Sequence, residues 1–192
     1  RKAVWKAAGA CKDITAAHLQ AVADLLEKQT GRYVKLPYGL TATRVYNVIE
    51  IMGKRKETEK ICLPIDTDRL PENLLAGEWK FSFKKFLYDG NTDKIPRKMY
   101  TKWFDYDKIK DSLAIRNRRK GDYFVLDAAG HHKKLEDYFV NEKIPASHRD
   151  EQLLLAGEDE IFWIVGGRMA YGTGISDATR WVLEITASNS SH

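Results

Sequence analysis

The sequence predicts an α+β fold, in which one amphipathic helix is combined with many short strands joined by turns. Apolar residues recur at helical spacing between Leu19 and Leu26. The segment Trp79–Lys84 instead alternates apolar and polar side chains, with the period of two that is typical of a strand. Clusters of Gly, Asn and Asp, such as Asp89–Asp93, separate the apolar runs and indicate turns.

The helix is expected near the start of the chain, ahead of the first strands. Asp13 and Thr15 are suitable N-caps, and Gly31 is a suitable C-terminal stop. Runs rich in β-branched and aromatic residues then predict three strands, at Arg32–Leu36, Thr41–Met52 and Ile61–Ile65.

The segment Trp79–Lys84 is predicted to separate an aromatic face from a basic face. Its three aromatic residues fall on one side of the strand, so we expect them in the core. Interleaved aromatic and basic residues can also indicate base stacking, which is the alternative interpretation. Lys80 and Lys84 lie on the other side, where they could meet RNA.

A boundary between two domains is expected within residues 105–112, which divides the chain into residues 1–108 and 109–192. In the second domain the pattern predicts one short helix, at Lys133–Val140. Phe139 and Trp163 are expected in its core. Strands are predicted at Leu113–Arg116, Tyr123–Leu126, Ile161–Val165, Met169–Tyr171 and Trp181–Ile185.

The charge distribution favours a polyanionic partner. The 192 residues carry a net charge of +5, and Lys80–Lys120 alone holds 13 basic against 5 acidic residues. A basic band on a folded chain suggests nucleic acid, and a merely solvated surface is the alternative. No apolar run is long enough for a membrane span, so no membrane partner is expected.

The ends and the cysteines suggest a piece of a longer, cytoplasmic protein. Arg1–Trp5 has the pattern of a helix interior, and neither an initiator Met nor a signal peptide precedes it. Cys11 and Cys62 are far apart and form no CxxC pair. We therefore expect two buried free thiols in a reducing compartment.

No complete catalytic, cofactor or metal site can be assigned from the residues. The phosphate-binding patterns GxxxxGK[ST] and GxGxxG are missing, and Gly172–Gly174 is better explained as a turn. Ser147 and His148 are adjacent, a spacing that rarely gives nucleophile and base geometry. His131 and His132 have no third ligand at usable spacing, so a surface turn is expected there.

One cluster of cations remains, and it predicts contacts with phosphate. Arginine forks match phosphate oxygens in geometry, and lysine adds a point charge. A charged hairpin with solvated side chains is the alternative. The residues concerned are Arg116, Arg118, Arg119, Lys120, Lys133 and Lys134.

Several segments around these cations resemble the C-terminal domain of bacterial tRNA(Ile)-lysidine synthetases. They are Arg118–Asp122, Lys133–Phe139, Ile144-Pro145, Arg149-Asp150 and Ile161–Arg168, in an order and spacing that match through Thr179–Ile185. Upstream, Lys12–His18 and Leu36–Leu40 resemble the middle domain of that family, so the resemblance covers nearly all of the chain.

The resemblance implies a function that composition cannot show. The family uses ATP to activate the wobble cytidine of a tRNA(Ile) with a CAU anticodon and joins lysine to C2 of that base. Its catalytic domain carries an SGGxDS loop, which is missing from this sequence. ATP and Mg²⁺ are therefore expected to bind a domain outside this fragment, which would be inactive alone. The family also implies a small β-barrel-like C-terminal domain and, often, a homodimer.

The expected role of the chain is to dock tRNA. The predicted phosphate contacts are the six clustered cations together with Arg149, Arg168, Lys80 and Lys84. Arg149 could instead form an internal ion pair with Asp150. Two other classes of function are kept open: a basic interaction module that binds an acidic protein, and an independent enzyme.

Overall fold

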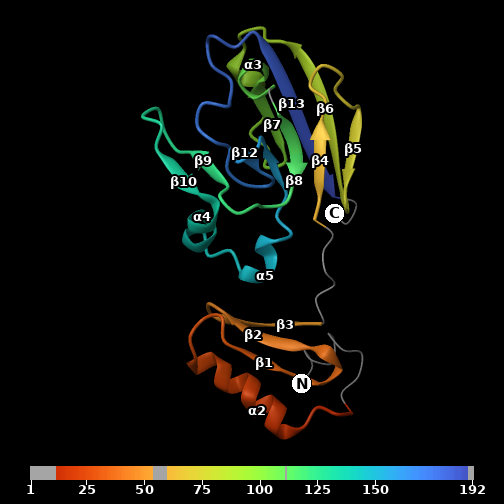
Figure 1. The fold of residues 1–192 in the computed structure, drawn as a ribbon, viewed down its shortest axis with the longest axis vertical. Helices are drawn as coiled ribbons and strands as arrows, with labels where there is room; N and C mark the ends of the chain where they lie inside the picture. The colour runs from red at the N-terminus through yellow and green to blue at the C-terminus, as the bar shows by residue number, and fades with distance from the viewer. Residues whose placement is uncertain (1–11, 54–59, 111, 190–192) are drawn as a thin grey trace. The chain divides into compact units, whose positions relative to one another are not determined.

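The computed structural model describes residues 12–53, 60–110 and 112–189, and the chain divides into two compact units, Arg1–Thr58 and Glu59–His192. Figure 1 shows the elements of each unit. The helical pattern expected at Arg1–Trp5 and the thiol of Cys11 lie outside the described residues. Within the described part of the chain, no helix is long and apolar enough to cross a membrane.

Unit 1 consists of one helix and a three-stranded antiparallel sheet. Thr15 caps the helix, accepting a hydrogen bond from the backbone of His18, and the His18 ring accepts one from the backbone of Thr15 in return. Leu25 and Ala42 are among the residues that close the core between helix and sheet. The elements are α2 (Ala16–Asp24), η1 (Leu25–Glu27), β1 (Tyr33–Lys35), η2 (Pro37–Gly39), β2 (Thr41–Val45) and β3 (Val48–Met52), with strand order β1-β2-β3.

The predicted strand Thr41–Met52 is in fact a hairpin. Tyr46 has φ +51 and reverses the chain between β2 and β3, so Val45 pairs with Val48. Both arms are rich in β-branched residues, which is why the pattern alone did not locate the turn. The helix α2 also ends before the expected stop at Gly31.

Unit 2 contains two four-stranded antiparallel sheets, which confirms the α+β class with mainly antiparallel strands. The first sheet has the order β5-β6-β13-β7 and the second β12-β11-β8-β4. The strands are β4 (Cys62–Ile65), β5 (Asn73–Ala76), β6 (Trp79–Leu87), β7 (Thr101–Asp105), β8 (Leu113–Arg116), β11 (Leu154–Ala156), β12 (Ile161–Ile164) and β13 (Trp181–Asn189).

The two sheets pack face to face around the main core of unit 2. Phe81 of β6 and Phe104 of β7 belong to the same cluster of buried residues as Ile115 of β8 and Trp163 of β12. The rings of Phe104 and Trp163 lie 6.2 Å apart between centroids. Phe81 and Trp163 are each 0% exposed, which confirms the core positions predicted for them, whereas Trp79 and Phe83 are half-buried and pack against the same cluster.

A third layer covers the other face of the second sheet. Leu154 of this sheet packs against Phe124, Leu135 and Phe139, which come from a hairpin and a helix beside it. This explains why every residue of β11 and β12 is buried, since both faces of the sheet are covered. The covering elements are β9 (Tyr123–Val125), β10 (His132–Lys134) and α4 (Leu135–Asn141), and Figure 1 shows them beside the sheets.

The predicted boundary near residue 108 falls inside unit 2, where strand pairing joins the two sides of it. The whole of β13 pairs with β6, from Trp181 opposite Leu87 to Asn189 opposite Trp79. On the second sheet, β4 pairs with β8. A cut at 108 would break both ladders, whereas the chain divides into its compact units between residues 58 and 59. The remaining short helical elements are η3 (Thr92–Lys94), α3 (Tyr106–Ile109) and α5 (Ala146–Arg149).

Candidate nucleic-acid interface

Arg116 closes β8 and is buried, so the prediction that it contacts phosphate does not hold. Its side chain is 1% exposed. The guanidinium donates to both carboxylate oxygens of Asp122, over 2.9 and 2.8 Å, and to the Glu158 carbonyl over 2.8 Å. This fork-to-fork pairing is the geometry that could have held a phosphate, but an internal carboxylate occupies it.

Asp122 and Asn117 fix the two ends of the loop between β8 and β9. The carboxylate of Asp122 also accepts from the backbone N–H of Arg119 over 2.7 Å. Asn117 exchanges two hydrogen bonds with the backbone of Ile61, over 2.7 and 3.0 Å. Neither residue was singled out in the sequence, because a buried polar anchor is recognisable only once its partners are known.

Arg118, Arg119 and Lys120, called the cationic loop below, lie between these anchors. Arg118 is half-buried and donates to the Asp150 carboxylate through Nε and a terminal nitrogen, over 2.8 and 2.7 Å. Its other terminal nitrogen lies 3.7 Å from Glu136. Part of the Arg118 charge is therefore balanced internally.

Arg119 and Lys120 are exposed and present the strongest free charge of the cationic loop. A terminal nitrogen of Arg119 lies 2.9 Å from the sulfur of Cys62. Cys62 is an exposed free thiol, which corrects the expectation that it is buried. The thiol sits on an edge strand, β4, and its side chain is not part of either core cluster of unit 2.

Lys133 and Lys134 lie on β10 and not at the start of a helix. The strand His132–Lys134 pairs with β9, and α4 begins one residue later at Leu135. Lys134 is exposed and Lys133 is half-buried. A cation at the start of a helix opposes the helix dipole, and of these two residues only Lys134, the N-cap of α4, takes that position.

Arg149 and Arg168 are placed near the same layer. Arg149 donates from Nε to the Ile144 carbonyl over 2.8 Å. Arg168 is exposed, donates to the Leu126 carbonyl over 3.3 Å, and lies 5.5 Å from the ring centroid of Phe124. Both guanidiniums are thus tethered by one nitrogen to elements that pack on the second sheet.

Lys80 and Lys84 lie elsewhere, on the outer face of the first sheet. They are exposed and stand opposite Ser188 and Glu184 of β13. The inner face of this sheet packs on the second sheet, and α4 with its hairpin covers the far face of that second sheet. The predicted contacts therefore fall on opposite sides of the layered unit, and the structure does not bring them together.

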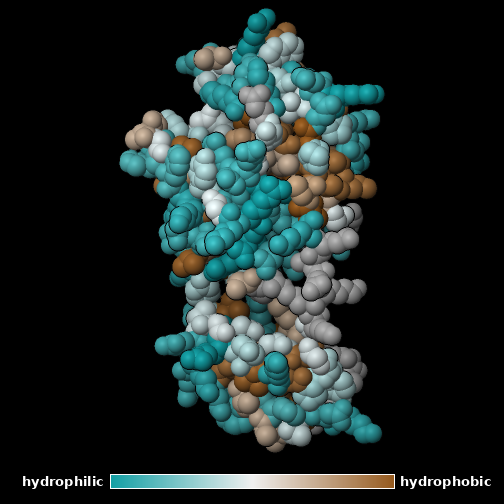
Figure 2. All heavy atoms as spheres, viewed as in Figure 1, coloured by the Kyte–Doolittle hydropathy of each residue, from teal (hydrophilic) through white to brown (hydrophobic). Residues whose placement is uncertain are grey.

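Hydrophilic side chains dominate the surface over α4 and α5 in Figure 2, whereas apolar side chains gather over β4 and β5. Leu75 of β5 is 70% exposed and contributes to the apolar side. The cations near α4 and α5 thus belong to a continuous polar surface, which suits a wet, charged partner such as RNA.

One carboxyl group and one phenol group near the hairpin have pKa values shifted from their ordinary values. The hydrogen bond from His131 to Asp127, over 2.8 Å, holds the pKa of the Asp127 carboxyl below its ordinary value. Burial of Tyr138 in α4 raises the pKa of its phenol above the ordinary value, and the charge of Glu142 adds to this, while Arg168 opposes it.

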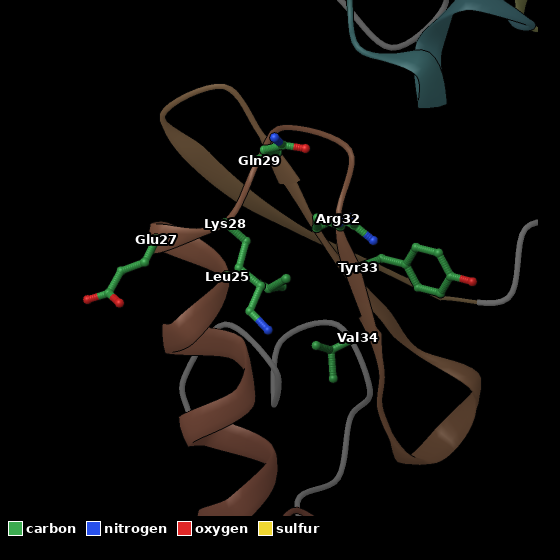
Figure 3. Close-up of a pocket in the computed structure, with 7 residues that line it drawn as sticks. All are labelled: Leu25, Glu27, Lys28, Gln29, Arg32, Tyr33 and Val34. Carbon is green, nitrogen blue, oxygen red and sulfur yellow. The ribbon is translucent and has the colours of Figure 1, made fainter.

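Near these cations, the described residues form no cluster that could hold a metal ion. Among the described residues, no group of three or more His, Cys, Asp and Glu side chains could hold a metal ion. A hollow of about 520 Å³ lies in unit 1, between η1 and β1 (Figure 3), where Lys28 extends toward Leu25 and Val34 while Glu27 points away. None of the predicted contact residues lines this hollow.

Comparison with known proteins agrees with the resemblance seen in the sequence. Residues 113–185 match the family model of the TilS substrate C-terminal domain. The tRNA(Ile)-lysidine synthase of Caldanaerobacter subterraneus subsp. tengcongensis is 34% identical over 169 residues, which are 88% of this chain and 36% of that protein. That of Clostridium perfringens is 29% identical over 194 residues, covering 97% of this chain and 41% of that protein.

A solved structure shares the fold. The crystal structure of a TILS C-terminal domain aligns with a TM-score of 0.51 at 19% identity, covering 69% of this chain and 98% of that chain. The chain spans 36 to 41% of the length of the two relatives above.

Proposed function

Since the chain belongs to the tRNA(Ile)-lysidine synthase family, we propose that it is the part of such an enzyme that docks tRNA. The observation that carries this proposal is the group of exposed cations on the braced loop and on β10, namely Arg119, Lys120 and Lys134. These residues fall inside the segment that matches the family model. Half-buried Arg118 and tethered Arg168 extend the same group.

Prior organisation of the loop supports the proposal. Binding a polyanion with flexible lysines costs side-chain entropy, and a loop fixed before binding reduces that cost. Here the buried ion pair of Arg116 and Asp122 fixes the loop, together with the backbone hydrogen bonds made by Asp122 and Asn117. The exposed side chains of the loop therefore project from a backbone that is already fixed. Lys80 and Lys84, on the opposite side of the unit, would contact tRNA only if it wrapped around the unit or met that face separately.

The chemistry of the whole enzyme is proposed from the names of the relatives and from the family resemblance. The reaction would be ATP-dependent joining of lysine to C2 of the wobble cytidine in tRNA(Ile) with a CAU anticodon, in the cytoplasm. No residue of this chain is assigned to ATP, lysine or Mg²⁺, because the SGGxDS loop is missing from its sequence. A homodimer stays a prediction, which sedimentation of the chain would check.

The proposal is tested by the salt dependence of tRNA binding to the 192-residue chain. If about four phosphates are neutralised, affinity should fall roughly several hundred-fold between about 50 mM and about 300 mM salt, because each contact releases counterions. Replacing Lys120 or Lys134 by Gln should reduce the slope of log affinity against log salt by about one each. Equal affinity at both salt concentrations would refute phosphate binding.

A matched control variant distinguishes the loss of a phosphate contact from the loss of one positive charge anywhere on the surface. Lys94 is exposed like Lys120 but is ion-paired with Asp89, far along the chain from the cationic loop. Lys94→Gln should therefore leave the slope unchanged. A basic module for acidic proteins, the rival function, predicts the same affinity for heparin as for tRNA.

A further inference from the structure

An exposed pair of stacked rings lies on the hairpin that carries Lys134. The rings of Tyr123 in β9 and His132 in β10 are 4.6 Å apart between centroids, with an angle of 10° between their planes. Tyr123 is half-buried and His132 is exposed. One face of the imidazole is thus supported by tyrosine, while the residue keeps its solvent exposure.

The strand register places a cation on the same face. Lys134 stands directly opposite Tyr123, and His132 stands opposite Val125. Residues paired across an antiparallel ladder point to the same side, and every second residue repeats that side. Tyr123, His132 and Lys134 therefore share the outer face of the hairpin, whereas Phe124 points to the core.

The end of the hairpin is fixed before any ligand binds. The carboxylate of Asp127 accepts from the backbone of Ala129 and of His131, over 3.0 and 3.3 Å, and from the His131 ring. Gly130 turns the chain with φ +80. The imidazole of His132 therefore stands on a rigid two-stranded support, which Figure 1 shows projecting beside the two sheets.

We propose that the outer face of the β9–β10 hairpin binds an unpaired RNA nucleotide, with its base stacked on His132 and its phosphate at Lys134. This inference rests on the proposed tRNA function and deepens it. A flat ring on a rigid strand, beside a cation, suits the face of a base, because every base has a π-face and a neighbouring phosphate. A paired base keeps both faces inside the helix stack and cannot use this surface.

The charges around the hairpin differ between its two edges. The acidic turn Glu158–Glu160 meets Tyr123, whose backbone N–H donates to the Asp159 carbonyl over 3.1 Å. A phosphate is repelled from that side. Lys134 lies on the neighbouring strand, on the same face as the stacked rings, and it attracts the phosphate that flanks the stacked base.

The test uses the full chain with a labelled single-stranded RNA of about ten nucleotides and a duplex with the same number of phosphates, measured by fluorescence anisotropy. His132→Ala should weaken binding of the single strand by about 5- to 150-fold, the usual effect of removing one base–aromatic stack. The duplex should lose less than about twofold. His132→Phe should restore most of the loss, because phenylalanine keeps the stack.

His148→Ala is the control, as it removes another exposed imidazole, which lies outside the hairpin and stacks on no ring in the described structure. It should leave both affinities unchanged. The proposal is overturned if His132→Ala behaves like His148→Ala, if single strand and duplex lose equally, or if His132→Phe restores nothing. Wild-type binding to tRNA, measured in the same titrations, tests the docking function separately, because that binding can persist without the stack.

Discussion

The buried pair of Arg116 and Asp122 makes the sharpest prediction about stability. In the variant Arg116→Met the methionine fills most of the space of the arginine stem, but the charge partner disappears. The Asp122 side chain is 0% exposed and would keep a single described donor, the backbone N–H of Arg119. The carbonyls of Asn117 and Glu158 would also lose their guanidinium donors.

The size of the effect follows from what is left unpaired. Breaking a buried ion pair by removing one partner costs about 3–5 kcal/mol, because the remaining charge has lost its solvent and its partner. For a unit of this size, about 3 °C of melting temperature corresponds to about 1 kcal/mol, so unit 2 should melt roughly 10–15 °C lower. Arg119→Met, at an exposed position, should cost less than about 0.5 kcal/mol.

The assay is urea unfolding followed by tryptophan fluorescence, with a double-mutant cycle. Arg116→Met with Asp122→Asn should cost clearly less than the sum of the two single changes, since the double variant leaves no charge stranded. Losses below about 1 kcal/mol for Arg116→Met, or strict additivity, would refute the role of the pair as the brace of the cationic loop. The folded Arg116→Met protein should also keep the salt slope of tRNA binding, because this guanidinium touches no phosphate.

Two further predictions concern the backbone and the pH dependence of unit 2. Gly166 has φ +77, and a Cβ there would lie 2.7 Å from a ring carbon of Tyr100; Gly172 has φ +81 with open space around it. Gly172→Ala should therefore cost about 1–2 kcal/mol and Gly166→Ala at least about 1 kcal/mol more, as measured by thermal unfolding. Because burial raises the pKa of Tyr138, the unfolded chain releases this proton first, and stability should fall as pH rises above about 10. Titration of the tyrosinate absorbance should show one fewer high-pKa group in Tyr138→Phe, and an unchanged curve would contradict the burial effect.

Local patterns predicted many of the elements of this fold, but not how they pair. The alternation of Trp79–Lys84 placed Phe81 correctly at 0% exposure, since the side-chain period of a strand is a local property. The boundary predicted near 108 falls inside unit 2, because β13 returns over about a hundred residues to pair with β6. Composition along the chain carries no signal of such a non-local ladder.

The candidate interface was predicted by residue type, and the structure sorts those residues by their partners. Arg116 and Arg119 belong to the same basic cluster in the sequence. The side chain of Arg116 is 1% exposed and is paired with a carboxylate, whereas Arg119 is exposed. The difference depends on Asp122, which lies six residues after Arg116 and accepts hydrogen bonds from its guanidinium. The stack of Tyr123 on His132 was missed for a related reason, because it exists only in the register of β9 and β10.

A count of charges therefore overstates the strength of this interface and misplaces it. Residues 116–149 hold 8 basic against 5 acidic side chains, but the charge of Arg116 is paired with Asp122 and that of Arg118 is shared between Asp150 and Glu136. The charge that remains for a phosphate is concentrated at the tip of the cationic loop and on the outer face of the hairpin. The internal ion pairs neutralise part of the positive charge and fix the backbone, so that the few exposed cations and the His132 ring project from fixed positions.

A variant that adds lysines elsewhere on unit 2 should accordingly raise general polyanion binding without raising the preference for RNA with an unpaired base. Comparison of the affinities for single strand, duplex and heparin would measure the difference.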